Sequence, residues 1–148
     1  MKFLITGITG FAGPHLANLL HARGHEVYGL IRRTNGMESD IRDVVPDDVY
    51  EDITFVYGEL TNYRSLVTIF KDTQFDGVFH LAAQSHPPTS FRDPIGTMDT
   101  NVMGSANLFQ VIQDFQDNCK VMFCSTSEVY GNVGSDGRKI RWDDTILP

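Results

Sequence analysis

The chain has 148 residues, enough for one domain and too few for an ordinary two-domain enzyme. Its net charge of -7 argues against a broad surface for nucleic acid or anionic membranes. The opening MKFLITGITG is interrupted too early by glycine for a signal peptide or a membrane span, so we expect a cytoplasmic protein. Cys119 and Cys124 have neither CxxC nor zinc-site spacing, and we expect buried free thiols and no metal site.

The first elements are a strand, a helix and a strand. An apolar run over residues 2–6 stops at a glycine and predicts a buried strand. Leucines at helical spacing predict a helix over roughly residues 14–22, with Gly24 just past its end. A second strand is expected over residues 26–31.

Residues 32–52 are polar and acidic, which predicts a long loop with room for one helical turn. The remaining expected elements alternate between strand and helix, followed by an irregular tail. They are strands at 53–57, 77–82 and 120–124, helices at 62–72 and 98–115, and a tail at 131–148.

This alternation predicts an α/β fold, a doubly wound parallel sheet of the Rossmann type. Right-handed crossovers give the strand order 3-2-1-4-5. We expect the sheet to be incomplete on its C-terminal side, with an exposed edge at the fifth strand that promotes self-association.

A glycine triplet follows the first strand and opens the first helix. Residues 7–13 read GITGFAG, a GxxGxxG pattern. Glycines permit a tight turn, and the main-chain N–H groups of a helix start can bind a pyrophosphate. The alternative is a turn that is rich in glycine for geometry alone.

The end of the second strand bears on the choice between NAD and NADP. An acidic residue there would bind a ribose 2′-hydroxyl, but the sequence has Arg32 and Arg33. Guanidinium groups match the oxygens of a 2′-phosphate, which favours NADP. The alternative is a pair of solvated arginines.

Together these motifs resemble the extended short-chain dehydrogenase/reductase family. The further matches are Gly58-Glu59-Leu60, His80-Leu81-Ala82-Ala83 and residues 100–105, TNVMGS. Glu59 stands where the family has aspartate. The resemblance covers almost the whole chain.

Within the family, Gln84-Ser85-His86 and residues 125–131 (STSEVYG) are similar to segments of the GDP-mannose 4,6-dehydratases. The resemblance implies a nucleotide-sugar substrate that contacts Ser85, Thr126 and Ser127. It implies cofactor contacts from Gly7, Thr9, Gly10, Phe11, Ala12, Gly13, Arg32, Arg33, Thr34, Asn35, Glu59, Leu60, Leu81, Ala82, Ala83, Gln84 and Ser85. Gly96 departs from the tyrosine usual in these dehydratases.

The resemblance also implies a reaction at the end of the fifth strand. Glu128 would be the base that removes the sugar C5 proton, and Thr126 would donate a hydrogen bond to the C4 oxygen. Without the motif, a surface carboxylate and a turn hydroxyl are the simpler interpretation.

None of the five tyrosines begins a Tyr-x-x-x-Lys motif, which the family uses to take the C4 hydroxyl proton. We therefore hypothesise that residues 1–148 are the N-terminal, NADP-binding portion of an enzyme that is a homo-oligomer when intact. The sugar-binding domain would lie outside this portion, which would bind NADP without turnover. Two alternatives stay open: a nucleotide-sugar epimerase or reductase, and a non-catalytic NADP-binding module.

Overall fold

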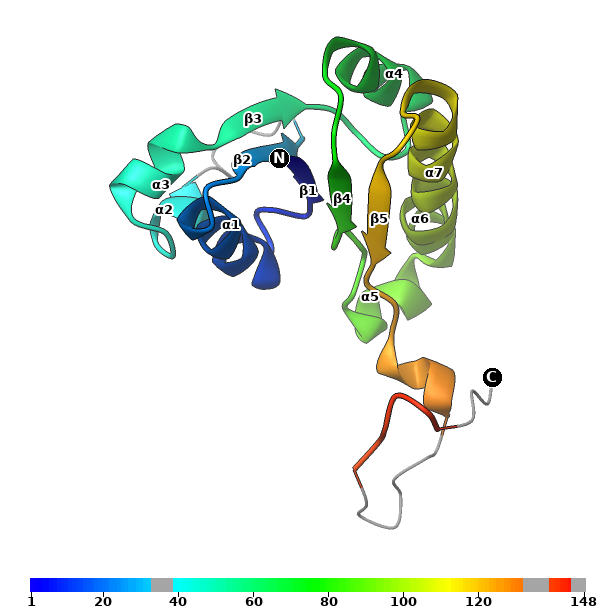
Figure 1. Ribbon diagram of the computed structural model, residues 1–148. Helices are drawn as coiled ribbons and strands as arrows, with labels where there is room; N and C mark the ends of the chain where they lie inside the picture. Colours follow the sequence, from blue (N-terminus) through cyan, green and yellow to red (C-terminus); the bar gives the residue numbers. More distant parts are fainter. Residues whose placement is uncertain (33–38, 132–138, 145–148) are drawn as a thin grey trace.

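The computed structural model describes residues 1–32, 39–131 and 139–144, and the part it describes contains a five-stranded parallel sheet (Figure 1). The strand order is β3-β2-β1-β4-β5, which confirms the predicted doubly wound α/β fold. The strands are β1 (Lys2–Thr6), β2 (Glu26–Ile31), β3 (Thr54–Tyr57), β4 (Gly77–His80) and β5 (Lys120–Phe123).

The register of the sheet aligns the carboxyl ends of its strands. Thr6 at the end of β1 lies opposite Leu30 of β2 on one side and His80 of β4 on the other. His80 in turn lies opposite Phe123, the last residue of β5. The loops that follow these strands therefore start side by side at one edge of the sheet.

Helices cover both faces of the sheet (Figure 1). One apolar cluster joins Ile5 to α1 (Ala12–Ala22), α2 (Ser39–Arg42) and α3 (Asp47–Asp52). The other joins Leu4 to α4 (Tyr63–Asp72) and α7 (Gly104–Phe115). Because Leu4 and Ile5 are neighbours in a strand, they point to opposite faces, and both are fully buried.

Two helix ends follow local sequence signals. Gly24 has a positive φ of 74° after α1, and its N–H donates to the carbonyl of His21 while the N–H of His25 donates to that of Leu20. This is the Schellman arrangement, for which glycine pays no steric cost. At the start of α4, the Asn62 side chain accepts a hydrogen bond from the N–H of Ser65.

Five helical segments correct the sequence predictions. The loop expected over residues 32–52 contains α2 and α3 instead of one turn. The helix expected over residues 98–115 is preceded by α5 (Pro87–Arg92) and α6 (Pro94–Met98) and includes a π-helical segment, η1 (Asp99–Met103), before α7. Proline in the first turn of α5 and α6, and Asp93 capping Gly96, explain why these short helices start where they do.

The strand ends and the cysteines bring further corrections. The fourth strand was predicted to reach residue 82 but ends at His80. Cys124 is exposed rather than buried, whereas Cys119 is half-buried, and burial together with Asp76 raises the pKa of the Cys119 thiol to about 11. Both thiols are free, as expected.

The expected exposed edge is present in the described sheet. All four residues of β5 are exposed, and they include the apolar residues Val121, Met122 and Phe123. Self-association through this edge stays a prediction. None of the described helices is long and apolar enough to cross a bilayer.

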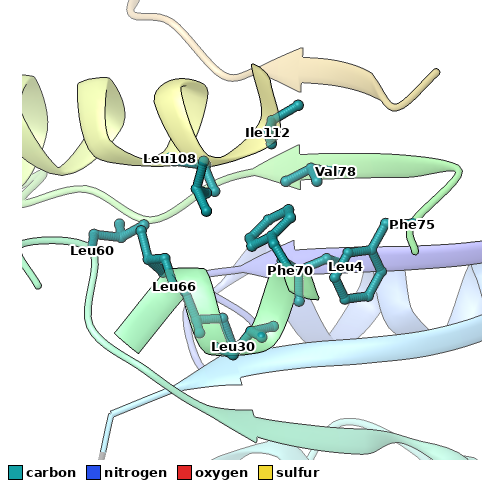
Figure 2. Packing of buried hydrophobic residues seen from close by; sticks show 11 residues of the cluster. Leu4, Leu30, Leu60, Leu66, Phe70, Phe75, Val78, Leu108 and Ile112 are labelled. Carbon is teal, nitrogen blue, oxygen red and sulfur yellow. The ribbon is translucent and has the colours of Figure 1, made fainter. Parts of the chain in front are cut away.

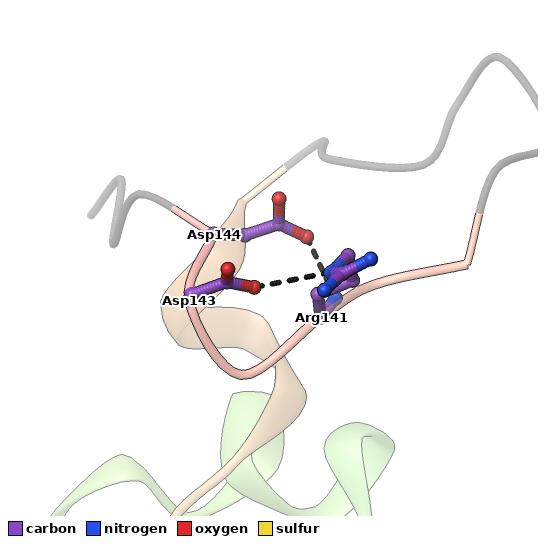
Figure 3. Close-up of polar contacts among 3 residues, drawn as sticks. All are labelled: Arg141, Asp143 and Asp144. Carbon is purple, nitrogen blue, oxygen red and sulfur yellow. Dashed lines mark hydrogen bonds and ion pairs between the residues drawn. The ribbon is translucent and has the colours of Figure 1, made fainter.

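Beyond β5 the chain leads away from the sheet through a short 3-10 helix, η2 (Ser127–Tyr130) (Figure 1). Residues 139–144 contain a turn, in agreement with the irregular tail predicted for this region. The N–H of Arg141 donates to Asp144 and its Nε lies 3.2 Å from Asp143 (Figure 3). Both contacts are exposed to solvent.

Phe70 belongs to the apolar cluster that joins α4 and α7 to the sheet, where its loss should destabilise the fold. Phe70 is fully buried, and its ring lies 5.3 Å from that of Phe75 (Figure 2). Phe70→Ala should lower the free energy of unfolding by roughly 3–5 kcal/mol because it removes buried surface and leaves a cavity. Urea denaturation measures this change.

The matched control is Phe91→Ala, since Phe91 is 86% exposed. The same chemical change there should alter stability by about 0.5 kcal/mol or less. Equal losses at the two positions would contradict the described core.

Candidate functional site

A cavity of about 670 Å³ lies at the carboxyl ends of the strands. Its volume falls within the range of roughly 300–1,000 Å³ typical of small-molecule sites. It is lined by Gly7, Thr9, Gly10, Phe11, Ala12, Gly13, Leu30, Ile31, Arg32, Gly58, Glu59, Leu60, Thr61, Leu81, Ala82, Ala83, Gln84, Ser85, His86, Thr100 and Cys124.

The glycine turn forms one wall of this cavity. Gly7 has a φ of 74°, and a Cβ there would lie 2.8 Å from the main-chain nitrogen of Ala82. A Cβ on Gly13 would lie 2.5 Å from the carbonyl oxygen of Gly7, so this glycine lets α1 approach β1 closely. A Cβ on Gly10 would lie 3.2 Å from the carbonyl oxygen of Gly7, which is a tight contact. Each of the three glycines therefore has a steric role.

The start of α1 is open to an anion. No side chain caps the helix, and its first turn carries no acidic residue. The free N–H groups of a helix start and the helix dipole both favour negative charge. A pyrophosphate-sized anion therefore fits beside Gly10 and the residues that follow it.

Two further parts of the predicted site line the same cavity. Arg32 follows β2, and Glu59 and Leu60 follow β3. Arg33, Thr34 and Asn35, also predicted to bind the cofactor, lie outside the described residues. Arg32 and the glycine turn therefore line one cavity. A solvated arginine with no role in binding would not need to lie there.

A second cavity of about 510 Å³ adjoins the first. The loop of residues 82–86 lines both cavities, and Ser125 and Thr126 contribute to the second. Ser85 and Thr126, both predicted to contact substrate, therefore share one cavity. The side chain of Ser127 is outside the described part.

The predicted catalytic pair lies on η2 and its N-cap. The Thr126 hydroxyl oxygen accepts a hydrogen bond from the N–H of Glu128 at 3.2 Å, so its own proton can be donated elsewhere. Glu128 is exposed, and neither cavity counts it among its lining residues. The structure places Thr126 in the second cavity but does not bring Glu128 into it.

Sequence reasoning missed several residues at the site. Thr61, His86, Thr100 and Cys124 line the first cavity without having been predicted to bind. The order of the strands was the available signal, because residues just past the carboxyl ends of parallel strands converge.

Gly96, noted as a departure, lies in α6, where its N–H donates to Asp93. It lines neither cavity. A Cβ at this position would collide with the Asp93 carboxylate, so a larger residue than glycine would disturb the Asp93 cap.

Under the floor of the site lies a buried histidine. His80, at the end of β4, is 2% exposed and contacts the Thr6 and Ser105 hydroxyls at 2.6 and 2.9 Å. Burial lowers the pKa of its imidazole, because the charged form loses its hydration. The ring is therefore neutral at neutral pH and acts as one donor and one acceptor.

The strand order, the glycine turn and the cavity at the strand ends define an α/β domain of the short-chain dehydrogenase/reductase class. The sequence profile of the family described as "GDP-mannose 4,6 dehydratase" matches residues 4–141. The chain belongs to this family.

Curated relatives include dehydratases and epimerases. The chain is 37% identical to GDP-mannose 4,6-dehydratase from Vibrio cholerae, and the match covers 93% of this chain and 38% of that protein. It is 34% identical to UDP-glucose 4-epimerase from Pisum sativum, over 88% of this chain and 38% of that protein. The chain thus spans well under half the length of these relatives.

Solved structures share the fold. UDP-glucose 4-epimerase from Thermus thermophilus, in complex with NAD, matches with a TM-score of 0.82 and 29% identity, over 100% of this chain and 45% of that one. The enzyme WbmH from Bordetella bronchiseptica, in complex with NAD⁺, matches with a TM-score of 0.75 and 28% identity, over 99% of this chain and 46% of that one. Both are similar to this chain over nearly its full length.

The lowered pKa of His80 generates a prediction about pH. The unfolded state takes up a proton near the ordinary histidine pKa of about 6.5, whereas the folded state resists protonation. This contribution to stability is therefore complete above about pH 7 and is lost as the pH falls below about 6.5. The free energy of unfolding should decrease over that range.

His80→Asn provides the comparison, because asparagine does not titrate. Urea denaturation at a series of pH values should give a shallower decrease for the variant than for the wild type. Parallel pH profiles would show that His80 is protonated equally in both states, contrary to its described burial.

Proposed function

We propose that this chain is the NADP-binding part of a nucleotide-sugar 4,6-dehydratase that acts on GDP-mannose. The observation that carries the proposal is the cavity at the strand ends, where the glycine turn, the open start of α1 and Arg32 meet. An extended dinucleotide needs main-chain donors for its pyrophosphate at the middle of such a crevice. Membership of the dehydratase family supports the choice of reaction.

The preference for NADP rests on Arg32. A 2′-phosphate would lie just past β2, where an NAD enzyme has an acidic side chain. Arg32 lines the cavity at this point, and its guanidinium can donate two hydrogen bonds to phosphate oxygens. Arg33, Thr34 and Asn35 follow directly in sequence and are proposed to complete this end of the site.

When bound, the nicotinamide supplies hydride acceptance and return. The chain's own part in the dehydration is proposed for two residues. The Thr126 hydroxyl, whose oxygen already accepts from the N–H of Glu128, would donate a hydrogen bond to the sugar C4 oxygen. Glu128 would remove the C5 proton and return it to the departing 6-hydroxyl, which requires η2 to close over the second cavity.

Two other functions have specific support. An epimerase or reductase is consistent with the epimerases among the relatives, but such an enzyme has no elimination step for Glu128 to catalyse. A non-catalytic NADP-binding module is consistent with the lack of Tyr-x-x-x-Lys in these 148 residues. The carboxylate beside Thr126 favours the dehydratase.

Arg32→Ala tests the cofactor. Calorimetric titration of the wild type should give tighter binding of NADP than of NAD. The variant should lose about tenfold or more in NADP affinity, the worth of a charge-assisted hydrogen bond, with NAD binding nearly unchanged.

Arg23→Ala is the matched control, because Arg23 lies at the opposite end of α1, away from the cavity. It should bind both nucleotides as the wild type does. Equal binding of NADP and NAD by the wild type would remove the case for NADP, and binding of neither would remove the proposed function.

The 148-residue chain itself should bind NADP without converting GDP-mannose. The reason is that no tyrosine here is followed by lysine at the fourth position, so the C4 hydroxyl lacks its usual proton acceptor. Incubation with GDP-mannose and NADP, followed by chromatography for the 4-keto-6-deoxy sugar, measures this. Formation of that product would contradict the assigned need for the tyrosine and lysine pair.

A further inference from the structure

A continuous chain of hydrogen bonds crosses the floor of the site beneath the loop of residues 82–86. The N–H of Ala82 contacts Thr6 Oγ1 at 3.2 Å, and this oxygen lies 2.6 Å from Nδ1 of His80. On the other side of the ring, Nε2 lies 2.9 Å from Ser105 Oγ, which lies 2.6 Å from the carbonyl oxygen of Asn101. This series of hydrogen bonds joins β1 and β4 to α7 and η1.

The carbonyl of Asn101 and the neutral imidazole ring together fix the direction of every hydrogen bond in this series. A carbonyl accepts, so Ser105 donates its single proton to Asn101 and must accept from Nε2–H of His80. Because the ring is neutral and its one proton is on Nε2, Nδ1 accepts a hydrogen bond from the Thr6 hydroxyl, whose oxygen in turn accepts from the N–H of Ala82. His80 is therefore held as the Nε2–H tautomer.

The side chain of Asn101 connects this series of hydrogen bonds to the same loop. Its Oδ1 accepts from the N–H of Gln84 at 2.7 Å, and its Nδ2 donates to the carbonyl oxygen of Gln84 at 3.0 Å. Asn101 belongs to η1, the π-helical segment that precedes α7. Ala82 and Gln84, two residues apart, are thus held from the β1 side and from the α7 side.

The loop needs such support because it has little apolar burial of its own. Ala83, Ser85 and His86 are exposed, yet they line both cavities together with Ala82 and Gln84. His80 itself lines neither cavity. His80, which lines neither cavity, therefore connects the hydrogen bonds that hold Ala82 to those that hold Gln84, and these two residues belong to the wall that both cavities share.

We infer that His80 is a positioning residue for this shared wall, and that its Nε2–H tautomer couples the Thr6 support to the Ser105 and Asn101 support. The inference rests on the proposed nucleotide site for its effect on binding, but not for its effect on the loop. An apolar residue of similar size would fill the space and leave the Thr6 and Ser105 hydroxyls without their ring partner.

Two amide variants separate the two halves of the coupling. Asparagine places its amide where Nδ1 stands, so His80→Asn keeps a partner for Thr6 and loses the one for Ser105. Glutamine reaches the position of Nε2, so His80→Gln keeps the partner for Ser105 and loses the one for Thr6. His25→Asn is the control, since His25 directly precedes β2 and packs on Phe3, at the amino ends of the strands and away from the loop of residues 82–86.

Amide hydrogen exchange followed by NMR reads the loop without any ligand. In His80→Asn the amide of Gln84 should exchange about tenfold faster than in the wild type, with Ala82 protected; in His80→Gln the pattern should reverse. In the wild type, the imidazole ¹⁵N spectrum should show protonated Nε2 and unprotonated Nδ1. General destabilisation would instead accelerate both amides together.

The same proteins are then titrated with NADP, and both His80 variants should bind it about tenfold more weakly than the wild type. The inference fails if the imidazole carries its proton on Nδ1, if the two amides do not respond separately, or if the variants bind NADP as the wild type does. A wild type that binds no nucleotide, while the exchange pattern holds, overturns the proposed function alone. Should either His80 variant not fold, Ser105→Ala must reproduce the His80→Asn pattern, or the inference also fails.

Discussion

The site depends on the point in the sheet where the chain reverses its direction of winding. From β1 the chain proceeds to β2 and β3 on one side, and β4 and β5 are added on the other. Because the strands are parallel, the loops after all of them leave the same edge, and the two groups of helices cover opposite faces. A crevice is left at that edge between the loops after β1 and β4, and the larger cavity lies in it.

Close approach of main chain to main chain sets the shape of this crevice. Gly7 lies so near the nitrogen of Ala82 that a Cβ would overlap it, and a Cβ on Gly13 would lie even closer to the carbonyl oxygen of Gly7. The turn after β1 therefore contacts both the start of α1 and the loop after β4 without side chains between them. Because no side chain caps α1, main-chain N–H groups remain available at its start, which suits a ligand that carries phosphate.

The sequence predicted the sheet well and the connecting segments less well. Strands β1 and β2 have the predicted bounds, because glycines or polar residues end their apolar runs. Helices α5 and α6 bury no residue, so apolar periodicity could not reveal them, and only their prolines and the Asp93 cap mark them. The fourth strand was predicted too long because Leu81 and Ala82 are apolar, although pairing with β1 ends at His80.

For the site, local motifs pointed to residues that the structure brings together, while their predicted contacts with a cofactor stay predictions. The glycine turn, Arg32 and residues 81–85 all line the first cavity. Contacts between distant residues were not predictable, since Thr6 and His80 are 74 positions apart and meet only through strand pairing. Nor does the sequence pattern reveal that Glu128 lies outside both described cavities while its neighbour Thr126 lines one.

A histidine in this core has an energetic cost that its partners offset. A buried polar atom without a partner destabilises a fold, and among the described residues every buried side-chain nitrogen and oxygen has one. Apolar packing could stabilise the floor of the site equally well, but it has no direction and would leave the loop above free to shift. Hydrogen bonds of fixed direction define where Ala82 and Gln84 stand. Since these two residues form the wall between the cavities, the geometry available to a ligand in either one is set by polar contacts beneath it rather than by apolar burial.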